Sequence, residues 1–298
     1  MGFTLDWNIR EEVAVTIKEF LKNHKISKSA LTDIKFKGGR ITVNGLEQNV
    51  KYKLNKGDHL AVIFPPEKPS EGLIPESIPL PIVYEDDFLL IVKKVPGMNT
   101  IPSREHPKGS LANALVGYYQ AKRIEATIHI VTRLDRDTSG LVLIAKHRHI
   151  HHLLSGQQKT GDVKRKYLAF AEGTMKPESG TINEPIGRCV DSIIQREVRE
   201  DGKNAITHYR VLTSKAAFSI VELSLETGRT HQIRVHLSHL GHPLLGDDLY
   251  GGSRKLISRQ ALHCYFLSFT HPITDKKMAF SIDLPDDLEK VIEEEERS

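Results

Sequence analysis

The chain has little cysteine and no long apolar run, and each absence excludes some classes of protein. Its two cysteines, Cys189 and Cys264, stand far apart and belong to no CxxC or Cys/His motif. A disulfide framework and a zinc site are therefore not expected. No apolar stretch approaches the roughly 18 residues that a membrane span needs. The first residues, MGFTLDWNIREE, hold no apolar signal core, and Asp6 stands where a myristoylation motif wants serine or threonine. We expect a cytoplasmic protein that neither enters a membrane nor is exported.

Acidic and cysteine ligands are also missing around the histidines that could suggest a metal. One histidine group reads HRHIHH at 147–152, and a second comprises His236, His239 and His242. Neither group has accompanying ligands at the spacing of a known metal site. We therefore predict no metal, and we expect the 147–152 group to face RNA or solvent.

Charge is uneven along the 298 residues. The formal net charge is +4. Residues 281–298 carry eight acids and two bases, a local net charge of −6, so the rest of the chain holds about +10. A body this basic is compatible with a polyanionic partner, although many enzymes without one carry as much charge. We expect residues 286–298 to form an acidic tail, either solubilising or a frayed helix end; mimicry of RNA is the sharper alternative.

Residues 1–64 read as one small α+β unit. An amphipathic segment at about 13–24 precedes a basic stretch at 25–40, and two strand-like runs follow, ITVNG and DHLAVIF. Basic residues outnumber acidic ones in this unit, and Lys28 and Lys35 lie in the basic stretch. The stretch is either a solvated helix face or a surface for RNA phosphates, with Lys28 and Lys35 as candidate contacts.

A proline-rich segment follows. Residues 65–81, PPEKPSEGLIPESIPLP, hold six of the chain's fourteen prolines. This composition favours an extended polyproline conformation over a helix or a central strand. We predict a linker between two domains.

The remainder, 82–285, is rich in strand-like patterns, among them VYEDDFLLIVKK, GLVLIAK, KYLAFAEG and AFSIVELSLET. Helices are predicted at 111–122, LANALVGYYQAK, and at 231–240, where Gly241 is placed to end the helix. The predicted fold class is therefore α+β, with a mixed, mainly antiparallel sheet in the larger domain.

The run IHIVTRLDRDTSGLVLIAKH is the most informative segment for chemistry. Two apolar strands flank a charged connection that ends in glycine and contains Arg133, Asp135, Arg136 and Asp137. Such a turn can hold a carboxylate rigidly. Aspartate, threonine, serine and glycine are also ordinary turn residues, so the run by itself leaves a purely structural role open.

Together with its surroundings, this run resembles the ribosomal large-subunit pseudouridine synthases of the A and D type (RluA/RluD). Their signature is RLD, two residues and TSG, which here reads RLDRDTSG. The resemblance continues through KRKYLA, THYRV, ETGRTHQIRVHLSHLGHPLLGDDLYG and LHCYFLSFTHP, and so spans nearly the whole chain. Residues 93–98, KKVPGM, depart from the usual DKPAGL-like phrase. The N-terminal unit is similar to the small S-four RNA-binding module of many such enzymes.

The resemblance implies an RNA pseudouridine synthase, an isomerase that works without a cofactor on ribosomal RNA, transfer RNA or both. The basic N-terminal unit favours structured ribosomal RNA, and a monomer is our default expectation. The resemblance also implies that Asp135 is the nucleophile and that Arg234, in HQIR, is its salt-bridge partner. Tyr167 would stack on the uracil, and Arg133 would enter the space that the extruded base leaves. The candidate phosphate contacts are Lys164, Arg165 and Lys166.

Two other functions stay open on the sequence. A nucleosidase or glycosidase would also use an aspartate at an anomeric carbon, but it needs a second carboxylate about 5–9.5 Å away, and Asp137 is the only sequence-near candidate. A non-catalytic RNA-binding or ribosome-assembly protein would rely on the N-terminal unit, and the joint presence of Arg133, Asp135, Tyr167 and Arg234 argues against it. No histidine or glutamate stands out as the base that removes the proton from uracil carbon five, which leaves Tyr167 or water.

Overall fold

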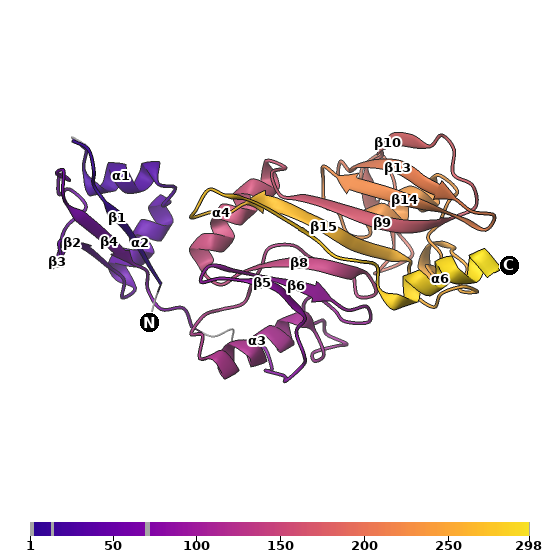
Figure 1. Cartoon of the computed structure of the whole chain (residues 1–298), viewed down its shortest axis with the longest axis horizontal. Coiled ribbons are helices and arrows are strands. Elements are labelled where there is room, and N and C mark those ends of the chain that lie inside the picture. The colour runs from indigo at the N-terminus through magenta and orange to yellow at the C-terminus, as the bar shows by residue number, and fades with distance from the viewer. Residues whose placement is uncertain (1–2, 13–14, 69–71, 298) are drawn as a thin grey trace.

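The computed structural model describes residues 3–12, 15–68 and 72–297, in two units that follow one another along the chain (Figure 1). The N-terminal unit is a four-stranded antiparallel sheet with two helices, and its strand order is β1-β4-β2-β3. Its elements are β1 (Thr4–Asn8), α1 (Ile17–Asn23), α2 (Lys28–Phe36), β2 (Arg40–Val43), β3 (Leu46–Glu47) and β4 (His59–Ile63). The predicted amphipathic segment yields the shorter helix α1, and residues 13–14 of that segment lie outside the described residues.

Local capping explains where the two helices of this unit begin. Thr16 and Glu19 form a capping box at α1, because the Thr16 hydroxyl accepts from the Glu19 amide and the Glu19 carboxylate accepts from the Thr16 amide. The Ser27 hydroxyl accepts from the Ala30 amide at the start of α2. Both helices bury apolar side chains against the sheet, so the unit has a core of its own.

The larger unit is built on a ten-stranded sheet. Its main path runs β10-β13-β14-β9-β15-β8-β6-β5, with β16 beside β15 and β7 beside β8. Among the described strands the pair β15·β8 is parallel and the other pairs are antiparallel, so the α+β class with a mixed, mainly antiparallel sheet is confirmed. The strands are β5 (Ile82–Glu85), β6 (Leu89–Lys94), β7 (His129–Ile130), β8 (Ser139–Ala145), β9 (Lys164–Glu172), β10 (Ser179–Asn183), β13 (Ile206–Ser214), β14 (Phe218–Leu225), β15 (Leu262–Thr270) and β16 (Lys277–Ser281).

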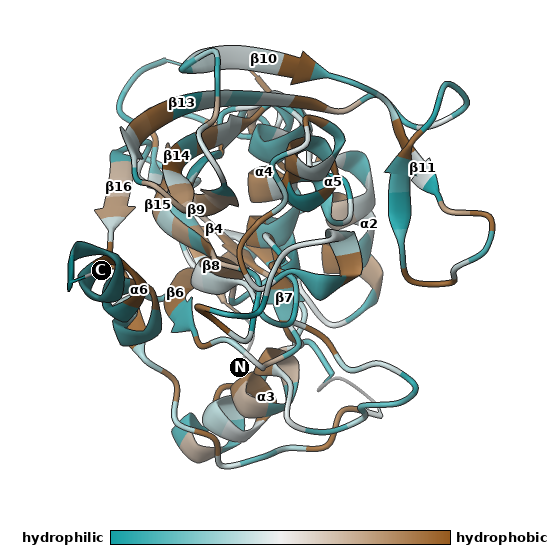
Figure 2. Cartoon of the chain, turned by 90° about the vertical axis from the view of Figure 1, so that its right-hand side faces the viewer, coloured by the Kyte–Doolittle hydropathy of each residue, from teal (hydrophilic) through white to brown (hydrophobic). Residues whose placement is uncertain are grey.

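A separate two-stranded hairpin, β11 (Ile186–Arg188) and β12 (Arg196–Val198), projects from the body of the larger unit (Figure 2). Its strands flank a loop whose apolar residues, among them Val190 and Ile193, are exposed. The hairpin returns to the body at β12, where the Arg196 amide donates to the Tyr250 hydroxyl at 2.9 Å. The hairpin is thereby tied to the region that holds the candidate site.

Two predicted helices are present, and a third was missed. Helix α3 (Leu111–Lys122) has the predicted bounds, and α5 (Gln232–His239) ends before Gly241, whose φ is +83°. Helix α4 (Arg148–Lys159) was not predicted, although Ile150 and Leu154 stand four residues apart on its buried face. A short 3-10 turn, η1 (Asp248–Tyr250), and the C-terminal helix α6 (Asp286–Arg297) complete the unit. No helix among the described residues is both long and apolar enough to cross a membrane.

The 147–152 histidine group does not face RNA or solvent as predicted, except for the exposed His152. The His147 ring stacks on Phe3 with centroids 4.2 Å apart, and the His149 ring lies 5.0 Å from Phe64. His149 is 5% exposed, and its Nδ1 has no hydrogen-bond partner. The group was misjudged because an imidazole can pack as an aromatic ring, and these two rings dock the N-terminal unit onto the larger one.

Acid is expected to weaken this docking. Burial lowers the pKa of His149 to about 4 from an ordinary 6.5, so between these values the unfolded chain binds the proton more readily than the folded chain. The free energy of unfolding should therefore fall as the pH drops below 6.5, by about 2 kcal/mol from this residue at pH 5. Urea unfolding at pH 7 and pH 5 tests this against His149→Phe, which keeps the ring and removes the titration. Equal pH dependence in both proteins would contradict the assignment.

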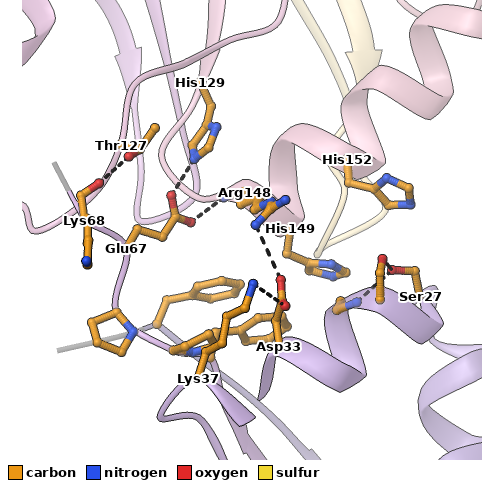
Figure 3. Close-up of a pocket in the computed structure, with 16 residues that line it drawn as sticks. Ser27, Asp33, Lys37, Glu67, Lys68, Thr127, His129, Arg148, His149 and His152 are labelled. Atoms are coloured by element: carbon orange, nitrogen blue, oxygen red, sulfur yellow. Dashed lines mark hydrogen bonds and ion pairs between the residues drawn. The ribbon is translucent and has the colours of Figure 1, made fainter. Parts of the chain in front are cut away.

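The described linker residues, 65–68 and 72–81, contain no helix or strand, and they are held against the larger unit. Glu67 accepts from the Arg148 amide at 2.6 Å and pairs with His129 at 2.5 Å. A cavity of about 760 Å³ opens between this segment, α2 and α4 (Figure 3). Asp33 of α2 reaches across it to Arg148 at 3.4 Å. None of Asp135, Tyr167 and Arg234 lines this cavity, so it is not the candidate catalytic site.

The acidic end forms a helix that packs on the larger unit. Helix α6 buries Leu288 and Val291 beside Phe170 and Phe218. Its acidic residues make specific contacts: Asp287 binds Arg259 through two hydrogen bonds of 2.6 and 2.9 Å. Figure 2 shows its outer face as hydrophilic. The glutamates occupy the end of this helix, and the apolar pair three residues apart that seats it was not recognised in the sequence.

Candidate active site

The residues between β7 and β8 form a turn that is anchored from several sides. The Thr100 hydroxyl donates to the Leu134 carbonyl at 2.6 Å. Arg259 donates to the Asp137 carbonyl at 3.0 Å, and the Gln260 amide donates to the Thr138 hydroxyl at 3.1 Å. This turn carries Asp135, so the carboxylate is presented from a rigid support, as the sequence analysis expected.

Gly140, which ends the TSG run, permits the close pairing that fixes this turn. The parallel strands β8 and β15 place Gly140 opposite Cys264. Gly140 has a φ of +125°, and a Cβ there would lie 2.3 Å from the Cys264 carbonyl oxygen. Any other residue would push the strands apart, so glycine is required by contact as well as by backbone conformation.

Asp135 lies beside Arg234, 99 residues away in the sequence. Arg234 Nη1 is 3.4 Å from Asp135 Oδ2, and the guanidinium also binds Asp247 in bidentate fashion at 2.7 and 2.8 Å. Burial alone would lower the pKa of Arg234, but the hydrogen bonds and charge of Asp247 outweigh it and raise that pKa. Within the described chain, Asp135 Oδ1 has no hydrogen-bond partner. The site therefore anchors one carboxylate oxygen and leaves the other free to react.

His231 and Tyr250 also border this carboxylate, and neither was singled out from the sequence. His231 Nε2 lies 4.0 Å from Asp135 Oδ2, and His231 Nδ1 is 2.8 Å from the Tyr250 hydroxyl. The Tyr250 ring packs against the Arg234 guanidinium at 4.9 Å. His231 lies inside the GRTHQIR stretch and Tyr250 inside GDDLYG, so motif membership was the signal that could have found them.

Tyr167 of β9 is buried near this carboxylate. It is 4% exposed, and its hydroxyl accepts from Arg165 at 3.2 Å. Burial raises the pKa of Tyr167 above its ordinary value, and the negative charge of Asp135 contributes to the rise. The residue is therefore a neutral phenol at neutral pH, suited to offer a ring face and unsuited to be a resting base.

The basic run on β9 is divided between the two faces of the sheet, because successive strand residues point to opposite sides. Arg165 shares the face of Tyr167 and caps its hydroxyl, whereas Lys164 is exposed. Lys166 pairs with Glu222 at 3.4 Å. Of these three predicted phosphate contacts, the structure leaves Lys164 unpaired within the described residues.

The other predicted contacts lie apart from one another. Arg133 is exposed in the turn, and within the described residues its guanidinium makes no hydrogen bond or ion pair. Lys28 and Lys35 are exposed on α2, outside the catalytic turn. The Asp137 side chain is 40% exposed and lies 3.9 Å from Arg136, so it is not enclosed in an apolar pocket.

Lys94 was not singled out from the sequence, and it contacts the turn directly. This lysine is 1% exposed and ends β6. It lies in the sequence KKVPGM, which departs from the usual DKPAGL-like phrase of the family. Its ammonium donates to three carbonyl oxygens: Val95 at 3.0 Å, Met98 at 2.8 Å and Arg136 at 2.9 Å. Burial lowers the pKa of Lys94 to about 7, and the charges of Asp137 and Asp135 oppose that change. The protonated amine has one N–H for each of the three carbonyl oxygens, so in this form Lys94 holds the residue next to Asp135.

Among the described residues no cluster of histidine, cysteine, aspartate and glutamate has the arrangement of a metal site. The chemistry that this arrangement can perform is nucleophilic attack by a held carboxylate beside a buried aromatic ring, with an arginine cation against one carboxylate oxygen.

Comparison with known proteins points to one family. The family model described as RNA pseudouridylate synthase matches residues 88–239. A protein of Bacillus subtilis (strain 168) named "Uncharacterized RNA pseudouridine synthase YjbO" is 53% identical over 281 residues, which cover 94% of this chain and 99% of that protein. The "Ribosomal large subunit pseudouridine synthase D" of Neisseria meningitidis is 38% identical, covering 88% of this chain and 73% of its own. The solved structure "Human RNA Pseudouridylate Synthase Domain Containing 1" has a TM-score of 0.59 at 26% identity, covering 70% of this chain and 85% of that one.

Proposed function

This chain belongs to the RNA pseudouridylate synthase family and is an isomerase that acts on RNA, and from that premise we propose that it isomerises uridines of ribosomal RNA with Asp135 as the nucleophile. The observation that carries the proposal is that the two oxygens of the Asp135 carboxylate differ in their contacts. Oδ2 lies 3.4 Å from Arg234, while Oδ1 has no partner in the described chain. A nucleophile needs this combination of a fixed carboxylate and a free lone pair.

In the proposed reaction Asp135 Oδ1 attacks ribose C1′ on the face opposite the uracil. The C1′–N1 bond breaks, and its electron pair leaves with the uracil ring. The ring turns so that its carbon five faces C1′, the new C–C bond forms, and the Asp135 carboxylate is released unchanged. Carbon five then loses its proton and N1 gains one, so the product is an isomer of the substrate and no cofactor enters the balance.

The surrounding residues support extrusion of the target base. Tyr167 offers a neutral ring for stacking, which is worth about 1–3 kcal/mol per base, once the Arg165 guanidinium at its hydroxyl moves with the incoming base. Arg133 is exposed and unpaired at the end of the same turn, where it can enter the vacated space and contact phosphates. These two roles follow from position and charge, and both belong to the proposal.

Ribosomal RNA is favoured as the substrate on two grounds. Relatives named ribosomal large subunit pseudouridine synthase D are 38% identical to this chain. The N-terminal unit also leaves Lys28 and Lys35 exposed on one helix, as a phosphate-contacting surface requires.

Release of tritium from carbon-five-labelled RNA tests the proposal. Purified protein is incubated with EDTA and [5-³H]uridine-labelled transcripts of large-subunit ribosomal RNA or of transfer RNA. We expect tritium in water from the ribosomal transcript and no free uracil. Release from transfer RNA alone would overturn the ribosomal assignment, and free uracil would indicate a nucleosidase instead.

A further inference from the structure

His231 has a backbone conformation that residues other than glycine seldom adopt. Its φ is +57°, in the left-handed region, and its side chain makes no capping hydrogen bond to α5. This conformation costs about 1–2 kcal/mol in a residue with a Cβ. Its side chain is 12% exposed and is aimed between Tyr250 and Asp135. A strained residue whose ring points at the nucleophile calls for a functional explanation.

The hydrogen bonds around Tyr250 fix which nitrogen of His231 carries the proton. The Tyr250 hydroxyl accepts from the Arg196 amide at 2.9 Å. Burial raises the pKa of Tyr250 to about 12, so the residue is a phenol with one proton to donate. Its other partner is His231 Nδ1 at 2.8 Å, which must therefore be the acceptor. Burial also lowers the pKa of His231, so the ring is neutral and its single proton lies on Nε2.

This N–H group faces Asp135 Oδ2 across 4.0 Å, which is too far for a direct hydrogen bond. A hydroxyl oxygen about 2.8 Å from both atoms, with its two hydrogen bonds about 90–110° apart, spans about 4.0–4.6 Å. The separation therefore suits a hydroxyl that donates to Oδ2 and accepts from Nε2–H. Both protein groups have the required polarity, one an acceptor and one a donor.

We propose that His231 Nε2 and Asp135 Oδ2 together bind the 2′-hydroxyl of the target ribose. The inference rests on the proposed function, in which Asp135 approaches C1′ from the face opposite the base. In ribose the 2′-hydroxyl lies on that same face, next to C1′. With Oδ1 at C1′, Oδ2 and the neighbouring Nε2–H are the groups that meet it. Enzymes that cleave glycosidic bonds through a carboxylate gain several kcal/mol from the corresponding contact to the sugar 2-hydroxyl.

The consequence is a specificity role for His231, since the 2′-hydroxyl distinguishes RNA from DNA. Tyr250 is a positioning residue in this scheme because it fixes the tautomer without touching the substrate. Arg196 contributes only its backbone amide.

The test compares His231→Gln with His231→Leu. Both variants have a residue with a Cβ at the same positive φ, so their backbone strain is matched. Glutamine alone restores a donor near the Nε2 position. Each protein is assayed on two ribosomal transcripts, with tritium at carbon five of either sparse ribouridines or sparse 2′-deoxyuridines. On ribouridine we expect the leucine variant to lose about tenfold in kcat/KM and the glutamine variant to lose less than about threefold. On deoxyuridine the wild type and both variants should differ by less than about twofold.

Several results would overturn the assignment. It fails if the two variants have equal activity on ribouridine, or if the leucine variant loses the same factor on both labels. If no variant, including wild type, acts on deoxyuridine, the ribouridine comparison decides alone. His239→Gln, an exposed histidine on the same helix, should match wild type throughout. Absence of release by the wild type from ribouridine would count against the ribosomal proposal and leave this one to be tested on transfer RNA with the same labels.

Discussion

Replacing Asp135 with asparagine is expected to lower uridine isomerisation by at least about 10⁴-fold, the order of loss when a nucleophile is removed. The amide has nearly the same shape as the carboxylate but lacks the negative charge and the nucleophilic oxygen. RNA affinity should stay within about tenfold, because phosphate contacts dominate affinity. The fold should also persist, since Arg234 keeps its bidentate partner Asp247. Tritium release, filter binding and thermal unfolding measure the three quantities.

Asp137→Asn is the matched control for this substitution. Asp137 is an acidic residue two positions away whose side chain is 40% exposed and lies beside Arg136. We expect this variant to keep activity within about threefold of wild type, a change of less than 1 kcal/mol. Substantial turnover by Asp135→Asn would contradict the role of Asp135 as the nucleophile. Loss of RNA binding by this variant would mean that Asp135 has a structural role.

Arg234→Leu should both unfold the protein more easily and inactivate it. The Asp247 carboxylate is 1% exposed, and Arg234 is its ion-pair partner. Removing one member of a buried pair leaves an uncompensated charge and costs about 3–5 kcal/mol. That is a large share of the roughly 5–15 kcal/mol that stabilises a typical domain. Urea unfolding measures the first effect and tritium release the second.

A double variant separates these two effects. Adding Asp247→Leu to Arg234→Leu removes the unpaired buried charge, so most of the lost stability should return. Activity should not return, because Asp135 still lacks the cation that anchors Oδ2. Recovery of activity along with stability would show that Arg234 serves only the fold, and the proposed role of Arg234 at the nucleophile would be withdrawn.

Local elements of this protein can be predicted from sequence wherever one signal dominates. The helix at 111–122 has the predicted bounds because a capping serine precedes a segment rich in apolar residues. Helix α4 was not predicted because the histidines between them obscure the four-residue spacing of Ile150 and Leu154. The packing of helix α6 was not foreseen for a similar reason, since its glutamates obscure Leu288 and Val291.

The candidate site depends on contacts that no local pattern reveals. Asp135 and Arg234 are 99 residues apart, and only resemblance to a known family suggested that they meet. Asp247 and Lys94 were not foreseen, since the burial of a charged side chain depends on partners brought from elsewhere in the fold. The Lys94 ammonium, for instance, needs the Arg136 carbonyl, 42 residues away, to complete its hydrogen bonds.

The anchoring of the catalytic turn by strand β15 also sets when the enzyme becomes competent during its own synthesis. Ser139 at the end of the turn bonds His263, 124 residues later, and Arg259 and Gln260 hold the same turn. At roughly 5–20 residues per second, the ribosome needs about 6–25 s to travel from one to the other. A nascent chain that has emerged only as far as Asp135 therefore carries this aspartate without the contacts that fix its turn. The chain must be synthesised beyond His263 before these contacts can form.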